Sequence, residues 1–272
     1  MSRTSGFIGV LRSRSTLRRV ARSCREIAIP ILPFVLLGGL WWLVSLSNIP
    51  AYILPSPMSV LREAINPRWR WSMHVLRTVQ EFLGGFGIAA IVGILLGIIV
   101  SWNNNIRKAL MPLIVFFNSL PKVAAAPLVL VWFGYGLIPT TLMAFIISFF
   151  PILLNTAYGI GAVPTEMIEL ALSFRTPKWK RYLKIHIPYA LPYIMAGLKL
   201  ASLMAVTGAI VGEFIAAERG LAALIMQAQA YVQTAAMVAA LVYISVLAMG
   251  FYSVINIVEW LLFPWARKPE SK

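Results

Sequence analysis

The residues of this chain that could carry chemistry are few: two histidines, one cysteine and nine glutamates, with no aspartate. A serine nucleophile needs a histidine base oriented by a carboxylate, but we expect His74 and His186 to lie on opposite sides of a membrane. The sequence has no Cys, His and acidic cluster at metal-ligand spacing, and no GxxxxGK[ST] loop for nucleotide phosphates. We therefore predict that the chain is not an enzyme and binds no cofactor or metal. Any ATP that it depends on must be bound by another subunit.

Lys122 is a cationic residue inside an apolar stretch, in NSLPKVAAAP. A lysine at the centre of a membrane costs roughly 2.5–3.5 kcal/mol, so something must offset that cost. One solution is a water-filled pathway for an anion, to which Asn118 and Ser119, one turn earlier, would add hydrogen-bonding groups. The others are an ion pair with Glu213, or a side chain that reaches the membrane surface along its aliphatic stem. Glu213 is interpreted either as a pathway residue or as a rim charge beside Arg219.

A short polar segment, residues 166–192, interrupts the apolar sequence with EMIELALSFRTPKWKRYLKIHIPYALP. Its basic residues fall within ten positions: Arg175, Lys178, Lys180, Arg181 and Lys184. The pattern predicts a helix, a turn at Thr176 and Pro177, and a second, amphipathic helix. Such a segment either provides a contact for a soluble partner or lies on the membrane with its lysines facing anionic lipid.

The elements that must position these residues are membrane helices. The chain is 60% hydrophobic and 12% charged, with a mean hydropathy of +0.81, whereas soluble domains are about 25% charged. Because a spanning helix needs roughly 20 apolar residues, we predict an all-α polytopic membrane helix bundle. Its six or so spans are expected near residues 27–46, 79–102, 109–133, 138–158, 188–216 and 235–262. Prolines inside several of them predict kinked helices, which often line or gate a path.

The net charge of +15 would suit nucleic-acid binding, but the positions of the basic residues relative to the membrane explain it differently. With the amino terminus in the cytoplasm, most lysines and arginines fall on the cytoplasmic side, as the positive-inside rule requires, so we expect no nucleic-acid partner. The predicted organisation is a basic cytoplasmic arm (1–26), one transmembrane domain (27–266) and a cytoplasmic tail (267–272), in a bacterial inner membrane. The single cysteine, Cys24, lies in the arm and cannot form an intrachain disulfide.

The largest loop predicted on the external side, residues 47–77, contains the aromatic and basic cluster RWRWSMH. Trp69 and Trp71 stand beside arginines, which suits an interfacial helix at the lipid headgroups. The alternative interpretation is a contact surface for an external partner.

The polar segment also resembles the cytoplasmic EAA loop of ABC importer permeases, whose pattern is Glu-Ala-Ala, then a glycine, then an Ile-x-Leu-Pro-like end. The matching residues here are Glu169, Ala171, Ile187, Pro188, Leu191 and Pro192. Further segments resemble the nitrate, sulfonate and taurine branch of these permeases: ILPSPMSV, NSLPKVAAAPLVLVWFGYG, and AGLKLA followed by VGEFIAA. The resemblance runs from about residue 54 to the end. The departures are Leu170 in place of an alanine, Arg175 in place of the usual glycine, and Glu81 where arginine is common.

The resemblance implies a permease-like fold whose coupling loop, about residues 160–187, contacts an ATPase. The implied partners are a second permease copy in a homodimer, two ATP-binding subunits that hold ATP and magnesium, a periplasmic or external substrate-binding protein, and the lipid membrane. The implied cargo is a small anion. Carried over to this sequence, the coupling residues are Glu169, Ala171, Ser173, Phe174, Arg175, Thr176, Pro177, Lys178 and Trp179.

Two other classes of protein are alternatives. A secondary transporter would usually show paired repeats and several acidic residues within the membrane, and an integral membrane enzyme would need a polar cluster at one depth. The sequence shows none of these features clearly.

Overall fold

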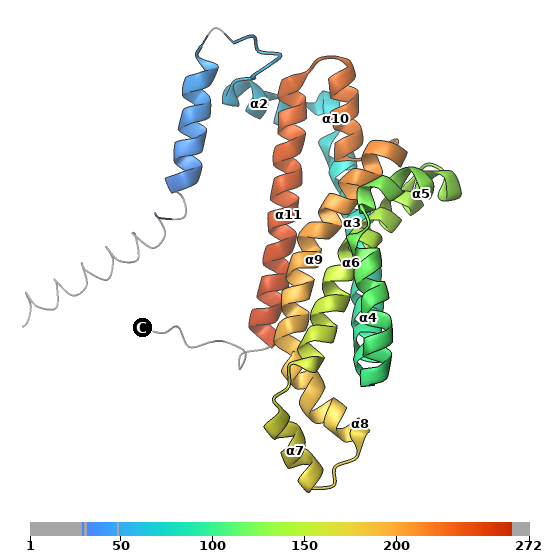
Figure 1. Ribbon diagram of the computed structural model, residues 1–272. Coiled ribbons are helices and arrows are strands. Elements are labelled where there is room, and N and C mark those ends of the chain that lie inside the picture. The colour runs from blue at the N-terminus through green and yellow to red at the C-terminus, as the bar shows by residue number, and fades with distance from the viewer. Residues whose placement is uncertain (1–28, 30–31, 48, 263–272) are drawn as a thin grey trace, which may run out of the picture.

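The computed structural model describes residue 29 and residues 32–47 and 49–262, and this part of the chain is built from helices and turns. Four of its helices are long and apolar enough to cross a membrane: α3 (Trp71–Ser101), α6 (Leu137–Gly161), the continuous helix Lys178–Ala216 and α11 (Thr234–Leu262). A bent pair of helices would add a fifth span. Figure 1 shows these helices side by side in one elongated bundle. The predicted all-α membrane helix bundle is confirmed.

The first predicted span, residues 27–46, falls only partly within the described residues. An apolar helix, Leu32–Ser45, is seen there, beside α11 but apart from the rest of the bundle (Figure 1). A short helix, α2 (Pro57–Ala64), follows it, and Trp41 Nε1 donates to Pro55 O at 3.1 Å. The predicted arm, residues 1–26, and tail, residues 267–272, lie outside the described residues.

Close packing of small residues holds the central helices α3, α6 and α9 (Ile187–Ala216) together. A Cβ atom added to Gly97 of α3 would lie 2.6 Å from Thr156 Cβ of α6, and one added to Gly208 of α9 would lie 2.7 Å from Ala144 Cα. Neither position can therefore accept a larger residue without moving a helix. Small residues allow membrane helices to approach closely where the hydrophobic effect gives no drive between them.

The predicted third span, residues 109–133, is not one straight helix. It consists of α4 (Asn104–Ser119), a 3₁₀ turn (Lys122–Ala125) and α5 (Ala126–Phe133), with a bend of 79° between the two halves. Leu120 is extended, with ψ of 138°, because it precedes Pro121, and the proline itself has no N–H to continue the helix. The predicted kink is present next to Pro121, and Lys122 lies at this helix break.

The predicted fifth span, residues 188–216, begins ten residues earlier than expected. The short helix α8 (Lys178–Arg181) runs through one π-helical turn (Tyr182–His186) into α9, so the helix is continuous from Lys178 to Ala216. We attribute the widened turn to Pro188, whose ring would clash with the carbonyl four residues before it in a regular α-helix. The second amphipathic helix is therefore part of a spanning helix and not a separate surface helix.

The aromatic and basic cluster of the loop at residues 47–77 is also placed differently from the prediction. Trp69 lies in a 3₁₀ turn (Pro67–Trp69) and is 4% exposed, while Trp71 opens α3 and is 8% exposed. Both indole N–H groups donate to Glu63, to its Oε2 at 2.7 Å and its main-chain oxygen at 3.0 Å. These tryptophans pack with α10 (Leu221–Ala230), a short helix that the sequence did not predict, so they do not form an interfacial anchor.

Candidate functional site

The predicted coupling residues lie in a hairpin formed by α7 (Thr165–Ser173) and α8, which projects from one end of the bundle (Figure 1). α7 ends in two hydrogen bonds: Arg175 N donates to Leu172 O at 2.7 Å, and Thr176 N donates to Ala171 O at 3.1 Å. This is the Schellman arrangement, in which the residue with positive φ is usually glycine. Arg175 takes that position with φ of 50°. The turn therefore forms without the glycine. The left-handed backbone of Arg175 costs roughly 1–2 kcal/mol of stability.

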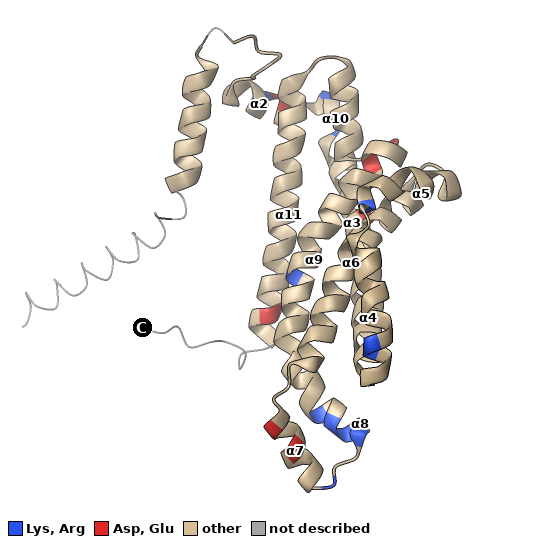
Figure 2. Cartoon of the chain, in the orientation of Figure 1, with Lys and Arg blue, Asp and Glu red and all other residues tan. Residues whose placement is uncertain are grey.

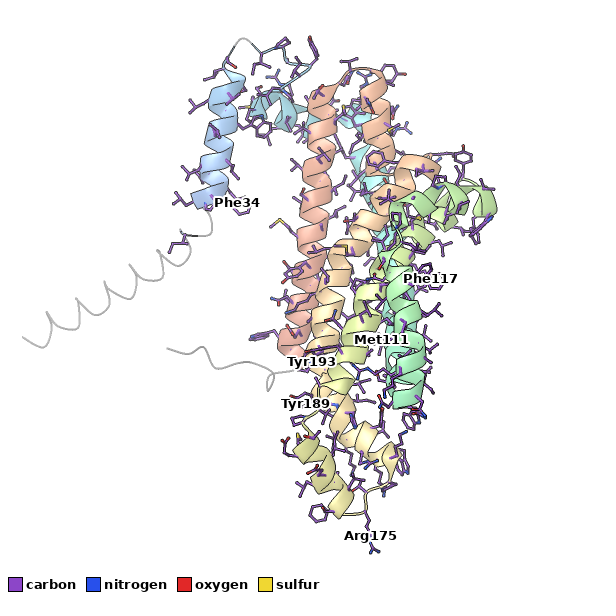
Figure 3. All side chains as sticks on the ribbon, viewed as in Figure 1. Phe34, Met111, Phe117, Arg175, Tyr189 and Tyr193 are labelled. Atoms are coloured by element: carbon purple, nitrogen blue, oxygen red, sulfur yellow. The ribbon has the colours of Figure 1, made fainter. Side chains whose placement is uncertain are left out.

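The hairpin presents large apolar side chains to its surroundings. Phe174 is 76% exposed and Trp179 is 54% exposed. Glu169 is exposed as well, and the Ser173 hydroxyl donates to its main-chain oxygen at 3.1 Å. Ala171 alone of the predicted coupling residues is buried. Figure 3 shows Arg175 at the tip, pointing away from the bundle.

Charge is divided between the two arms of the hairpin. α7 carries Glu166 and Glu169, whereas α8 carries Lys178, Lys180 and Arg181 (Figure 2). A partner that binds across the tip would meet acidic and basic groups on opposite sides of an apolar centre. Complementary charges of this kind fix the orientation of a partner more than they add affinity.

Sequence reasoning missed the contacts that join the hairpin to the spans. Tyr182, buried just after α8, donates its hydroxyl proton to Ser101 O and packs its ring against Trp102 at 4.5 Å between centroids. His186 stacks on Tyr182 at 4.5 Å and places Nδ1 3.0 Å from Ile160 O. One turn thus contacts the ends of both α3 and α6. The sequence feature that could have predicted these contacts is a tyrosine and a histidine four residues apart on an amphipathic helix.

At the break between α4 and α5, two predicted pathway residues come together. Lys122 Nζ donates to Asn118 O at 2.8 Å and to Asn118 Oδ1 at 3.0 Å, so it caps the end of α4. The ammonium also lies 5.1 Å from the centroid of the Phe150 ring. Ser119 is turned back, with its hydroxyl donating to Val115 O at 2.8 Å.

A cavity of about 330 Å³ adjoins Lys122, and its lining is almost entirely apolar and aromatic. Phe117, Phe145, Phe149 and Phe150 contribute rings to it. Lys122 is the charged residue of this lining. The arrangement can hold an anionic group against the ammonium and a flat apolar surface against the rings.

Glu213 lies in a different environment and does not pair with Lys122. It is 1% exposed, accepts a hydrogen bond from Thr78 Oγ1 at 2.5 Å and another from Ala222 N at 2.6 Å. Leu221 N donates to Thr78 Oγ1 at 3.0 Å, so both residues hold the first turn of α10. Glu213 is thus enclosed within the bundle, so it is not a rim charge.

A second carboxyl, Glu81, lies fully buried in the same region. Arg77 Nε donates to its Oε1 at 2.9 Å, and its Oε2 is buried without a hydrogen-bond partner among the described residues. Lower in the bundle, Lys199 of α9 forms an ion pair with Glu259 of α11. Glu213 and Glu259 therefore connect different helices, whereas Arg77, the ion-pair partner of Glu81, lies on the same helix.

Residues 89–264 match the model of a family described as "Binding-protein-dependent transport system inner membrane component". The chain belongs to this family of ABC importer permeases. The predicted resemblance is confirmed, and the chain is a transport subunit of a membrane-spanning type.

Individual relatives agree with the family match. The chain is 35% identical to the riboflavin transport system permease protein RibX of Chloroflexus aurantiacus, over 82% of this chain and 84% of RibX. It is 27% identical to the putative aliphatic sulfonates transport permease protein SsuC of Bacillus subtilis, over 89% of this chain and 88% of SsuC. A chain of the inward-facing MetNI methionine ABC transporter has the same fold, with a TM-score of 0.55 at 16% identity, over 71% of this permease and 99% of that chain.

Proposed function

We propose that this permease moves a small anionic solute of the nitrate, sulfonate or taurine class from an external binding protein into the cytoplasm. It would work as a homodimer with two ATP-binding subunits, which carry out the hydrolysis. Access to the solute path would alternate between the two sides of the membrane as those subunits open and close.

The observation that carries the proposal is the position of Lys122. Its ammonium lies at a 79° helix break beside a cavity of about 330 Å³, with Asn118 supplying its two hydrogen bonds. No carboxylate neutralises it within 4 Å among the described residues. An unneutralised cation at membrane depth favours an anionic solute, since the solute would offset the cost of burying the charge.

The exposed hairpin supports the second part of the proposal, contact with an ATPase. Phe174 and Trp179 would fill a recess on that partner, with Glu169, Ser173, Thr176, Pro177 and Lys178 around them. Large aromatic anchors of this kind dominate interface energies. Movement of the hairpin would reach α3 and α6 through Tyr182 and His186.

The direction of insertion is part of the proposal as well. The α7–α8 hairpin carries a dense group of basic residues, and the positive-inside rule favours the cytoplasm for that end. Both chain termini would then lie in the cytoplasm of a bacterium, with the permease in the inner membrane.

A second candidate solute is a planar heterocycle, because RibX is named for riboflavin transport and the cavity beside Lys122 is lined by phenylalanine rings. In this case the rings would stack on the solute and Lys122 would serve only to end α4.

The test reconstitutes the permease with its ATPase and binding protein in liposomes and measures ATP-dependent uptake of nitrate, taurine, an alkanesulfonate and riboflavin. The proposal expects uptake of one of the anions, a large loss in Lys122→Gln and retention in Lys122→Arg. Uptake of riboflavin alone, unaffected by Lys122→Gln, would select the second candidate.

A further inference from the structure

The end of the bundle opposite the hairpin contains a cavity of about 270 Å³ between the start of α3 and α10. Arg68, Arg70 and His74 line one side of it, and Gln227 and Tyr231 line the other. The lining residues include no carboxylate. This cavity is built from residues other than those beside Lys122.

The two arginines are available to a ligand. Ion pairs within 4 Å in the described part of the chain involve Arg77 and Lys199, and neither Arg68 nor Arg70 takes part in one. Glu63, the acid close to this region, is occupied by Asn66 Nδ2 at 3.1 Å and Trp69 Nε1 at 2.7 Å. The Arg68 guanidinium lies 5.3 Å from the centroid of the Trp69 ring, which holds it in place without neutralising it.

The first turn of α3 adds partial positive charge to the same cavity. Arg70 is the N-cap, in a left-handed conformation with φ of 46°, and its side chain makes no capping hydrogen bond. Met73 and His74, in the first turn, also line the cavity. Met73 N donates to Arg70 O at 3.0 Å, so this turn contributes the positive end of the helix dipole, which favours an anion.

His74 offers a further polar group to the cavity. Its side chain is 8% exposed, and Nδ1 is engaged with the main chain of Gly220, at 2.8 Å from the oxygen and 3.1 Å from the nitrogen. No hydrogen bond joins Nε2 to another described residue, and the His74 ring lines the cavity. When Nδ1 accepts the hydrogen bond from Gly220 N, Nε2 carries the proton and can donate it to a bound oxyanion.

We propose that Arg68, Arg70, His74 and the first turn of α3 form a binding pocket for a phosphate-type oxyanion. The oxyanion is either the phosphate of a lipid headgroup or a free phosphate, and two guanidinium groups suit it because each can bind two oxygens at once. The volume suffices for such a group and not for a folded partner. The bound oxyanion would hold the start of α3 against α10, whichever solute the permease carries.

The test uses the permease purified with its partner subunits in a neutral detergent. Two probes are titrated: phosphatidylglycerol, followed by native mass spectrometry, and inorganic phosphate, followed by its competition with that lipid. The variant is Arg68→Gln with Arg70→Gln. Arg62→Gln is the matched control, because Arg62 is an exposed arginine of α2 nearby that does not line the cavity.

We expect one saturable lipid per chain in the wild type, binding about tenfold weaker for each guanidinium removed, and little change in the control. Competition by inorganic phosphate would identify a site for the free anion as well, and its absence would identify a headgroup site. The proposal is overturned if neither probe saturates, if the double variant binds like the wild type, or if Arg62→Gln weakens binding equally. It is also overturned if the double variant loses only its association with the binding protein.

Discussion

At the α7–α8 end, Phe174 and Trp179 are mostly exposed, whereas at the α10 end Glu213 is 1% exposed and its carboxylate is hydrogen-bonded within the chain. Both ends join helices through polar residues. The hairpin exposes its large apolar side chains. In contrast, Thr78, Glu213 and the start of α10 form hydrogen bonds with one another. Exposure of this kind is typical of a surface that a partner covers, and internal pairing is typical of a structural joint.

The largest effect should come from breaking the buried joint. Glu213→Ala would leave Ala222 N without its acceptor inside the bundle, which costs about 1–3 kcal/mol, while Thr78 Oγ1 would keep His74 O as an acceptor at 3.1 Å. We expect a clear fall in the unfolding midpoint of the purified chain, measured by thermal unfolding in detergent. Glu213→Gln retains one acceptor oxygen and should lie between the wild type and Glu213→Ala. Equal unfolding midpoints of all three proteins would show that this hydrogen-bond network does not stabilise the fold.

A smaller effect should follow at the link between hairpin and spans. Tyr182→Phe removes the hydrogen bond to Ser101 O and keeps the ring contact with Trp102, at a cost of about 1 kcal/mol. We expect ATPase association to remain while solute-stimulated ATP hydrolysis falls. Tyr189→Phe is the control, since Tyr189 is a neighbouring exposed tyrosine on the same helix. Equal stimulation in both variants would exclude Tyr182 as a transmitting contact.

The smallest effect is a gain in stability at the hairpin turn. Arg175→Gly should stabilise the protein by about 1 kcal/mol, because glycine accepts the positive φ of 50° without strain. Arg175→Ala removes the same side chain but keeps the strain, so thermal unfolding of the two variants separates backbone from side-chain effects. If Arg175→Ala stabilises as much as Arg175→Gly, the turn is not strained.

The sequence predicted the hairpin well because it is a local feature. Its polar residues stand out against an apolar chain, and the turn at Thr176 and Pro177 depends on neighbours in sequence. The role of Glu213 was not predictable in the same way, since Thr78 lies 135 positions away and resembles any threonine in a span. Whether Glu213, Asn118, Ser119 or Lys122 contacts a solute stays a prediction.

The spans show the same contrast between local and distant information. Hydropathy located α6 and α11 to within a few residues, because it depends on composition alone. Prolines inside the spans predicted kinked helices, but the sequence did not give the size of the 79° bend next to Pro121. Hydropathy also separated α8 from α9, because the charged residues of α8 hid the continuity of the helix.

The central claim is that the exposed hairpin couples this permease to an ATPase. The most direct measurement uses two single variants of the hairpin, Phe174→Ala and Trp179→Ala, with Tyr52→Ala as the control. Tyr52 is similarly exposed but precedes α2, at the other end of the bundle. The amount of co-purifying ATP-binding subunit and its solute-stimulated hydrolysis are measured for each. The account predicts that each hairpin variant weakens association about 30-fold, as expected for a loss of about 2 kcal/mol at an interface anchor, and that Tyr52→Ala behaves like the wild type. Wild-type association and stimulated hydrolysis in both hairpin variants would contradict it.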